Sequence, residues 1–398
     1  MQRPTTTDIR YRKQVARALL SSGPEALEAA VPDLAGAPDL AAAPGVAAAP
    51  AGLSINWPSG LAPVPRPPAV APDPEGPLPT ADVLVVTWTV AEHKALADVL
   101  TPGHPPRGWL GYRHRFTDRF RPQIRAGAPA RAAGRLGSWY PTRVGGLQVL
   151  CLKSELHLNQ DGVATGTGTA TLPVRELFSQ LIEEVQPRLV LTIGTAGGVF
   201  GHHGLGDVVV TRAAKFRLAD EFRNEPFNHQ TYRSQWEIPT THLAEAEQLM
   251  AEVRPRLVEP GFGPPTKRYP FGGSLLSSEP NLASIHRDGV DFPEFHPILT
   301  TDFFEFGTSA NHLEEEGCAV EMGDAALGLA CEGLAAPPKW AVVRNLSDPQ
   351  INAELPTGTG PLNMQIHWAV WYYEAFGYWT SVAGALAAWG IIAGLDGS

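Results

Sequence analysis

The chain has 398 residues, of which 43% are apolar, and its formal net charge is −10. A chain of this length and apolar content can bury a sizeable core, in one large domain or in two to three ordinary ones. Lysine and arginine form no cluster along the sequence. We therefore exclude a nucleic-acid backbone as partner, because phosphate binding requires concentrated positive charge, whereas a single nucleotide or nucleoside is not excluded.

The cysteines, Cys151, Cys318 and Cys331, lie far apart and form no C-x-x-C pair. This spacing argues against a structural zinc site and against a disulfide framework, and it favours a reducing compartment. The first segment, MQRPTTTDIRYRKQ, carries charges without the apolar stretch that a signal peptide has. We therefore expect a cytoplasmic protein.

Residues 8–22, DIRYRKQVARALLSS, have the spacing of one amphipathic helix. Two interpretations are open: a frayed terminus, or a helix that docks on a partner or on a second subunit. Residues 31–80 contain 13 prolines and 12 alanines. Because proline fixes φ and lacks an N–H donor, we expect no β-ladder and no long helix there. Residues 1–80 are therefore predicted to be an arm with a linker, and residues 81–398 to be the folded domain.

The folded domain begins with ADVLVVTWTV at 81–90, a run typical of a buried strand, and AEHKALADVL at 91–100 has helical spacing. Strands and helices alternate from there on, which indicates an α/β domain with a largely parallel or mixed central sheet flanked by helices. The aromatic segment 367–389 carries Glu374 and many small residues. We interpret it as a core and subunit-interface helix rather than as a membrane span or a base-stacking platform. Further strands are expected at 146–156, 189–194, 206–218, 297–304, 318–320 and 338–348, and a further helix at 167–187.

Polar side chains follow the ends of these strands, where ligands of open α/β sheets bind. Taken singly, they have ordinary explanations: Glu92 can favour a helix dipole, and Asp348 before Pro349 can begin a turn. Together they predict a pocket whose carboxyl groups have shifted pKa values and act as acid and base. The candidate residues are Glu92, Thr195, Gly197, Asp302, Phe304, Glu321, Met322, Asp324, Arg344, Ser347 and Asp348.

The glycine cluster GTAGG at 194–198 is predicted to interrupt a buried strand and to form the floor of this pocket. It is not a G-x-G-x-x-G sequence and has no Walker lysine, so we expect neither a dinucleotide site nor a nucleoside-triphosphate site. The predicted chemistry requires no metal ion and no other cofactor. His202 and His203 follow in a loop, where we expect them at the surface rather than as ligands.

Four segments resemble the nucleoside phosphorylase and nucleosidase superfamily, and are most like its methylthioadenosine/S-adenosylhomocysteine nucleosidases. VLVVTWTVAEHKAL is similar to the opening strand, which ends in a catalytic glutamate, and IGTAGGVFGHHGLGDVVV to the glycine turn with the strand after it. AVEMGDAA is similar to the ribose segment VEME-A, and VVRNLSD to the segment VVRAISD, which holds the catalytic aspartate. The resemblance spans 82–348, is weak in 101–145 and 215–296, and does not cover 1–80.

The resemblance implies a phosphorylase-type fold and cleavage of the N-glycosidic bond in a purine nucleoside, with or without a 5' modification. It also implies a homo-oligomer, with neither nucleic acid nor membrane as partner. The implied roles are general acid to the base for Asp348, its orientation for Ser347, activation of water for Glu92, positioning of water and ribose for Arg344 and Thr195, contact with the sugar for Met322, and stacking on the base for Phe304.

Two departures from the family pattern shape the prediction. The second glutamate of VEME, which binds the ribose hydroxyls, falls on Gly323, where Asp324 or Glu321 would have to replace it. The arginine with which phosphorylases of this family hold phosphate is missing, so we expect water rather than phosphate as co-substrate. Phosphorolysis stays an alternative, as do a catalytically inactive domain that senses nucleosides or nucleotides and an enzyme with other chemistry on a non-nucleoside. Basic residues that could still supply charge for phosphate are Lys153, Arg212 and Arg217.

Overall fold

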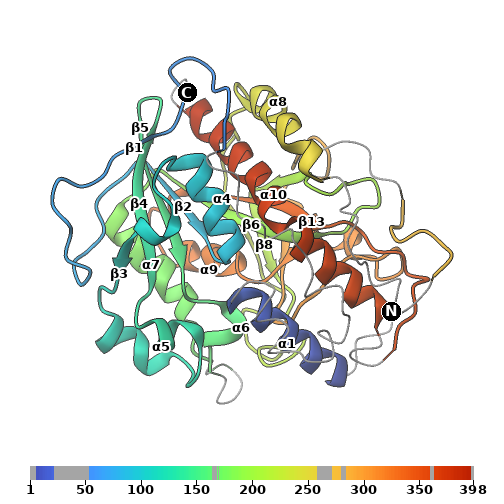
Figure 1. The fold of residues 1–398 in the computed structure, drawn as a ribbon. Helices are drawn as coiled ribbons and strands as arrows, with labels where there is room; N and C mark the ends of the chain where they lie inside the picture. The colour runs from blue at the N-terminus through green and yellow to red at the C-terminus, as the bar shows by residue number, and fades with distance from the viewer. Residues whose placement is uncertain are drawn as a thin grey trace.

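The computed structural model describes residues 6–21, 53–163, 168, 170–257, 271–278, 284–358 and 363–395. A mixed sheet runs through the molecule, and helices cover both of its faces (Figure 1). Strand β2 shows how the sequence produces this arrangement, because its side chains alternate between two apolar clusters. Leu84 and Val86 face the cluster that contains helices α7 and α9, whereas Val83 and Val85 face the cluster that contains α4, α8 and α10. The predicted α/β architecture with a mixed central sheet is confirmed.

The elements have the following bounds. The strands are β1 Val64–Pro65, β2 Val83–Thr87, β3 Leu110–Tyr112, β4 Gly137–Val144, β5 Leu147–Ser154, β6 Leu189–Gly198, β7 Val208–Thr211, β8 Ala213–Phe216, β9 Thr231–Arg233, β10 Ile285–Arg287, β11 Ile298–Thr300, β12 Ala319–Glu321 and β13 Lys339–Asp348. The α-helices are α1 Thr6–Ser21, α4 Val90–Leu100, α5 Pro129–Ala133, α6 Leu158–Asp161, α7 Pro173–Val185, α8 Leu243–Val253, α9 Ala325–Glu332 and α10 Met364–Leu395.

The sheet is organised around β6, in the order β1-β4-β5-β2-β6-β12-β11-β8-β9, with β13 paired to both β6 and β7. Residues 189–192 of β6 pair in parallel with β2, and nearly its whole length pairs in parallel with β13. At Gly197 and Gly198 the antiparallel strand β12 takes the place of β2. Among the described strands, none therefore pairs with residues 193–196 on that side of β6, and the candidate site lies at this opening.

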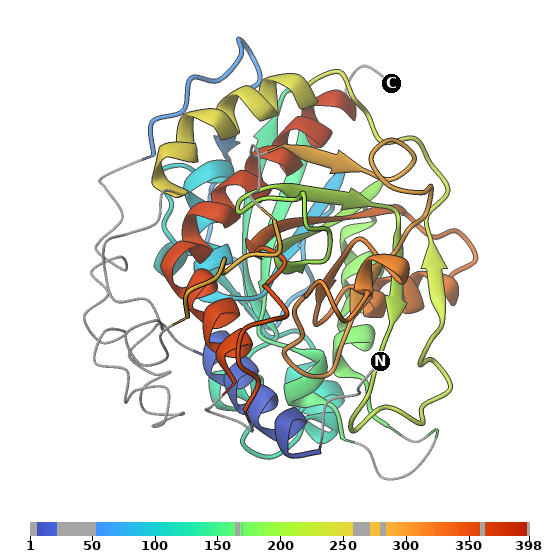
Figure 2. The ribbon, with the colours of Figure 1, turned by 90° about the vertical axis from the view of Figure 1, so that its right-hand side faces the viewer.

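Helix α10 is long and apolar enough to cross a membrane, by length and composition, yet 89% of its most apolar window is buried inside the domain. It packs against α4, α8 and β13 (Figures 1 and 2). Trp368, Trp371 and Trp389 are fully buried along it. The prediction of a buried core helix over 367–389 is confirmed.

Several predicted element bounds are wrong; the strand predicted at 297–304, for example, is only Ile298–Thr300. Strand β6 continues through GTAGG to Gly198, because backbone pairing with β13 and β12 keeps these residues extended. The strand predicted at 206–218 is two strands, β7 and β8, which separate at Arg212, whose backbone N–H and guanidinium both donate to Asp288. Helix α7 starts at Pro173, a residue whose fixed φ and missing N–H suit the first turn of a helix.

The proline-rich segment is packed on the domain from residue 53 onward. Trp57 lies against Trp389 with 4.9 Å between the ring centroids, and the Trp389 indole N–H donates to the Leu61 carbonyl at 2.8 Å. Val64 and Pro65 form the short strand β1 against β4. The expectation that no ladder forms within 31–80 is therefore wrong here, where a two-residue edge strand accommodates proline. Residues 31–52 lie outside the described residues.

The predicted N-terminal helix is present as α1. It lies beside the N-terminal end of α10 (Figure 2), and Tyr11 and Val15 join an apolar cluster that contains Phe306 and Trp371. Arg12 pairs with Glu305, and Lys13 pairs with Asp220 and Glu221. In this chain α1 is thus docked on its own domain rather than frayed.

Candidate active site

A cavity opens beside residues 193–196 of β6, beyond the carboxyl ends of β2, β12 and β13. Most of the candidate residues line it: Glu92, Thr195, Gly197, Phe304, Glu321, Met322, Arg344, Ser347 and Asp348. Asp302 and Asp324 do not line it. Asp302 instead accepts hydrogen bonds from the backbone N–H groups of Ala219, Asp220 and Phe222.

Glu92 is held by a local turn and by a distant strand. It is the third residue of α4, and it forms a capping box with Thr89. One carboxylate oxygen accepts from the Thr87 hydroxyl at 3.0 Å and from the backbone N–H groups of Trp88 at 3.0 Å and Thr89 at 2.8 Å. The other accepts from the backbone N–H and the hydroxyl of Thr195, both at 2.9 Å. Burial favours the neutral acid, but the Arg344 charge and these N–H donors outweigh burial and lower the pKa of Glu92, so that it stays ionised.

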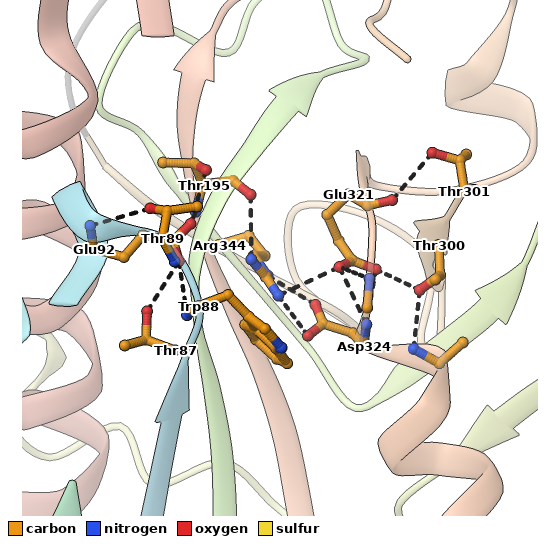
Figure 3. A network of polar contacts seen from close by, with 12 residues as sticks. Thr87, Trp88, Thr89, Glu92, Thr195, Thr300, Thr301, Glu321, Asp324 and Arg344 are labelled. Carbon is orange, nitrogen blue, oxygen red and sulfur yellow. Dashed lines mark hydrogen bonds and ion pairs between the residues drawn. The ribbon is translucent and has the colours of Figure 1, made fainter. Parts of the chain in front are cut away.

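Arg344 connects the two ends of the polar network drawn in Figure 3. Its guanidinium donates to both oxygens of Asp324, at 2.8 and 2.6 Å, and to Glu321 at 3.3 Å. It also donates to the Thr195 carbonyl at 3.3 Å and lies 5.0 Å from the centroid of the Trp88 ring. Asp324 is therefore the buried counter-ion of Arg344, which leaves it no free oxygen for a ligand in the cavity.

Glu321 lines the cavity but is committed to the turn between β12 and α9. Its oxygens accept from the Thr300 hydroxyl and from the backbone N–H groups of Gly323 and Asp324. Burial, together with the nearby Asp324 charge, raises the pKa of Glu321 to about 8. Gly323 lies against the indole of Trp88, since a Cβ added there would be 3.5 Å from the Trp88 Cζ2 atom.

Asp348 has the opposite environment from Glu92. One oxygen accepts from the Ser347 hydroxyl at 2.9 Å, whereas the buried Oδ2 atom has no hydrogen-bond partner. Burial raises the pKa of Asp348 to about 7. Oδ2 lies directly over Gly197, where an added Cβ would be 2.9 Å away. The glycine of GTAGG thus provides the room in which a protonated Asp348 can face a ligand.

The sequence missed several residues of the cavity wall: Trp88, His157, Thr301, Glu305 and Tyr373. Glu305 directly follows Phe304, and its two oxygens pair with Arg12 at 3.2 Å and with Arg217 at 2.7 Å. His157 comes shortly after the end of β5, and this position at a strand end, which it shares with the other candidates, could have indicated it. Tyr373 lies in the aromatic helix, where nothing local separates a cavity residue from the core.

The basic residues considered for phosphate binding are all paired. Lys153 bonds Glu155, Arg212 pairs with Asp288 at 3.1 Å, and Arg217 pairs with Glu305 at 2.7 Å and with Glu316 at 3.3 Å. None of the three lines the cavity. Of the described lining residues, Arg344 alone is a lysine or arginine.

The two neighbouring histidines of the loop after β6 differ in their exposure to solvent. His202 is exposed as predicted, but the surface position predicted for His203 is wrong, because it is 1% exposed. Its ring stacks on His286 with 3.9 Å between the centroids. The cysteines are free and buried, and the described residues contain no group of three or more His, Cys, Asp or Glu side chains placed to hold a metal ion.

No protein-family model matches the chain, and no curated protein matches its sequence. Solved structures with a similar fold include 5'-methylthioadenosine/S-adenosylhomocysteine nucleosidase from Neisseria meningitidis in complex with methylthio-immucillin-A, with 16% identity, a TM-score of 0.41, and coverage of 78% of this chain and 98% of that chain. Futalosine hydrolase of Helicobacter pylori has 12% identity, a TM-score of 0.41, and coverage of 78% and 96%. S-adenosylhomocysteine nucleosidase from Streptococcus pyogenes has 14% identity, a TM-score of 0.41, and coverage of 80% and 99%. These neighbours are named as nucleosidases and as a futalosine hydrolase, and the chemistry of this chain is inferred from its own site.

Proposed function

We propose that this chain hydrolyses the N-glycosidic bond of a purine nucleoside. One observation carries the proposal: a single cavity contains a carboxyl group that holds its proton near neutral pH and a carboxylate that stays ionised. The pKa of Asp348 is raised to about 7, whereas the pKa of Glu92 is lowered. Two acids whose environments push their pKa values apart are suited to act as a general acid and as its anionic partner.

The two acids contact neighbouring residues of strand β6. Glu92 bonds Thr195, and Asp348 lies over Gly197, two residues further along β6. Two residues of a strand span about 6 to 7 Å. A sugar carbon with the departing base on one side and a water molecule on the other fits between anchors at this spacing.

In the proposed reaction, Asp348 transfers its proton to a ring nitrogen of the base while the bond between the sugar carbon and the base breaks. The bonding electron pair leaves with the base, and the ionised Glu92 stabilises the positive charge that develops on the sugar. Water held by Glu92, Thr195 and Arg344 forms the new C–O bond and gives a proton to Glu92. Because the pKa of Glu92 is lowered, this proton moves only as the C–O bond forms.

Water is favoured over phosphate as the attacking group because the described residues of the cavity wall include no unpaired lysine or arginine. Arg344 is already neutralised by its ion pair with Asp324. A phosphate ion would therefore enter a cavity that also contains the ionised Glu92, without a free guanidinium or ammonium to balance its charge.

A second subunit and a 5' substituent on the substrate remain part of the proposal, as the sequence resemblance implies.

The test is an incubation of the full chain with adenosine, inosine, guanosine and 5'-methylthioadenosine, with and without phosphate, followed by quantification of free base. We expect base release without phosphate, and a fall of about 10² to 10⁴-fold in Asp348→Asn, which cannot donate the acid proton. Asp302→Asn, in a buried aspartate outside the cavity, is the matched control. Release that requires phosphate would identify a phosphorylase, and binding without release would identify a sensing domain.

A further inference from the structure

His157 lines the cavity and has no role in the proposed reaction. It lies between β5 and the short helix α6, and its backbone N–H donates to the carboxylate of Asp161. Asn159 of the same helix donates to the Met322 sulfur at 3.5 Å, which fixes this loop to the cavity wall. His157 is 5% exposed, so its imidazole is enclosed by the walls of the cavity that it lines.

The other titratable side chains of the lining are already engaged. Glu92 accepts hydrogen bonds from five donors, Glu305 bridges two arginines, and Glu321 holds its own turn. Arg344 is paired, and the Tyr373 hydroxyl is hydrogen-bonded to Thr89. The exceptions within the described chain are Oδ2 of Asp348 and the imidazole of His157, for which no protein hydrogen bond is found. Each is therefore available to a ligand.

The state of the imidazole decides what kind of ligand group it can bind. Burial, with the Lys153 charge, lowers the pKa of His157 to about 3, against the opposing effect of Glu155 and Glu92. The ring is therefore neutral, with one N–H donor and one nitrogen acceptor. A hydroxyl group, which both donates and accepts, is its natural partner, whereas an anion would meet only one donor beside the charge of Glu92.

We propose that His157 binds the hydroxyl groups of the nucleoside sugar, so that the substrates are nucleosides with a free 2',3'-diol rather than dideoxy nucleosides. This inference rests on the proposed function. The hydrogen bond from Asn159 to the Met322 sulfur places the loop of His157 beside Met322, on the wall of the cavity that both residues line. Met322, Gly323 and Trp88 form the wall there and bring no free carboxylate to the diol. Asp348 and His157 then fix the two ends of one ligand, the base and the sugar.

The test compares the affinities of adenosine and 2',3'-dideoxyadenosine by titration calorimetry, with the full chain in the Asp348→Asn background so that the ligand stays intact. We expect adenosine to bind about tenfold more tightly, the factor that one good hydrogen bond of about 1.4 kcal/mol corresponds to. His157→Ala should remove this preference and leave the affinity for the dideoxy ligand within about twofold. His157→Gln, which keeps a donor and an acceptor, should restore part of the preference, and His202→Ala, an exposed histidine outside the cavity, should leave it unchanged.

Equal losses for both ligands in His157→Ala would overturn the inference, because a merely structural residue would weaken both alike. A second readout is the ring NMR signal of His157, identified by its loss in His157→Gln, which should shift with adenosine and not with the dideoxy ligand. If wild type releases base but the preference does not depend on His157, the hydrolase stands and the inference fails. If the preference depends on His157 but no nucleoside releases base, the sugar site stands and the hydrolase fails. Binding of neither ligand would overturn both.

Discussion

At the scale of single residues, the two carboxyl groups of this site have different pKa values because they have different numbers of hydrogen-bond donors around them. Glu92 accepts hydrogen bonds from five donors and lies near Arg344, whereas Asp348 has one donor and a bare oxygen. Both are almost fully buried, so burial alone would make both neutral. The donors supplied by Thr195 and by the turn before α4 are what keep Glu92 ionised, and their absence is what leaves Asp348 with its proton.

The proton on Asp348 predicts a pH-dependent difference in stability between wild type and Asp348→Asn. Between pH 3.8, the ordinary aspartate value, and about 7, the folded state binds a proton that the unfolded state lacks. The unfolding free energy contributed by Asp348 therefore falls as pH rises through this window, by at most about 1.4 kcal/mol per pH unit. In urea denaturation from pH 4 to 8, the unfolding free energy of Asp348→Asn should increase relative to that of wild type as the pH rises.

The matched control for this experiment is Asp118→Asn, which changes an exposed aspartate in the same way. Its stability curve should run parallel to that of wild type over the whole range. A parallel curve for Asp348→Asn as well would show that the carboxyl group does not hold its proton in the folded protein.

Gly197→Ala should displace the carboxyl group of Asp348 while leaving its chemical identity unchanged. The added Cβ would lie 2.9 Å from Asp348 Oδ2, 3.1 Å from a methyl carbon of Val320 and 3.3 Å from the Phe306 Cα atom. We expect a loss of about 1 to 3 kcal/mol in unfolding free energy and a fall of about 10²-fold in base release, since small displacements of catalytic groups are costly. Gly108→Ala has nothing within 4 Å of its Cβ and should change neither quantity. Normal activity in Gly197→Ala would argue against the placement of Asp348 over this glycine.

At the scale of elements, α1 is the segment whose position the sequence alone does not predict. It reaches the cavity through one side chain, because Arg12 pairs with Glu305, which lines the cavity, and lies 4.9 Å from the centroid of the Phe306 ring. Lys13, the next residue, pairs instead with Asp220 and Glu221, which do not line it. The helix therefore offers two neighbouring ion pairs, one at the site and one beside it.

Arg12→Ala should affect substrate binding more than Lys13→Ala does. Arg12→Ala removes one of the two ion pairs that hold Glu305, the pair with Arg217 being kept, and the loss of about 1 kcal/mol should raise KM about fivefold. Lys13→Ala removes a similar docking contact of α1, so it controls for looser attachment of the helix, and we expect KM within about twofold of wild type. Steady-state kinetics of base release measures both. Equal KM changes would mean that α1 acts only through its docking.

At the scale of the whole molecule, the fold is closed by segments from opposite ends of the chain. Leu53, Ile55, Trp57 and Leu61 pack against the apolar cluster that contains α10. The predicted boundary of the folded domain is residue 81, whereas these contacts show that residues 53–61 also pack on the domain. The proline content of this segment limits its secondary structure without preventing its side chains from packing.

A chain that begins at residue 81 should therefore be less stable than one that begins at residue 53. Removing Trp57 and its neighbours exposes the Trp389 face of α10, and we expect a loss of about 3 kcal/mol in unfolding free energy. Thermal and urea unfolding of the two truncated chains measures the difference. Equal stability would place the boundary of the cooperative unit near residue 81 after all.

Much of this architecture is visible in local patterns. The β-branched run at β2, the helical spacing of α4 and the apolar segments of β12 and β13 depend on neighbours in sequence, so composition and periodicity locate them. The polar residues at strand ends gather because strand ends share one edge of a sheet. The predicted end of strand β6 is wrong because its glycines suggest a turn locally, whereas pairing with β13 and β12 holds them extended.

The sequence by itself determined the order of the main elements and the identity of most cavity residues, because both depend on short-range pattern and on position after a strand. Only the tertiary structure decided which of those residues are free. Thr195 donates to Glu92 from 103 positions away, Arg344 pairs with Asp324, and the loop after β5 brings His157 to the cavity. A polar side chain forms hydrogen bonds with the groups that lie within about 3 Å of it in the folded protein. Local sequence patterns do not reveal which distant residues come that close.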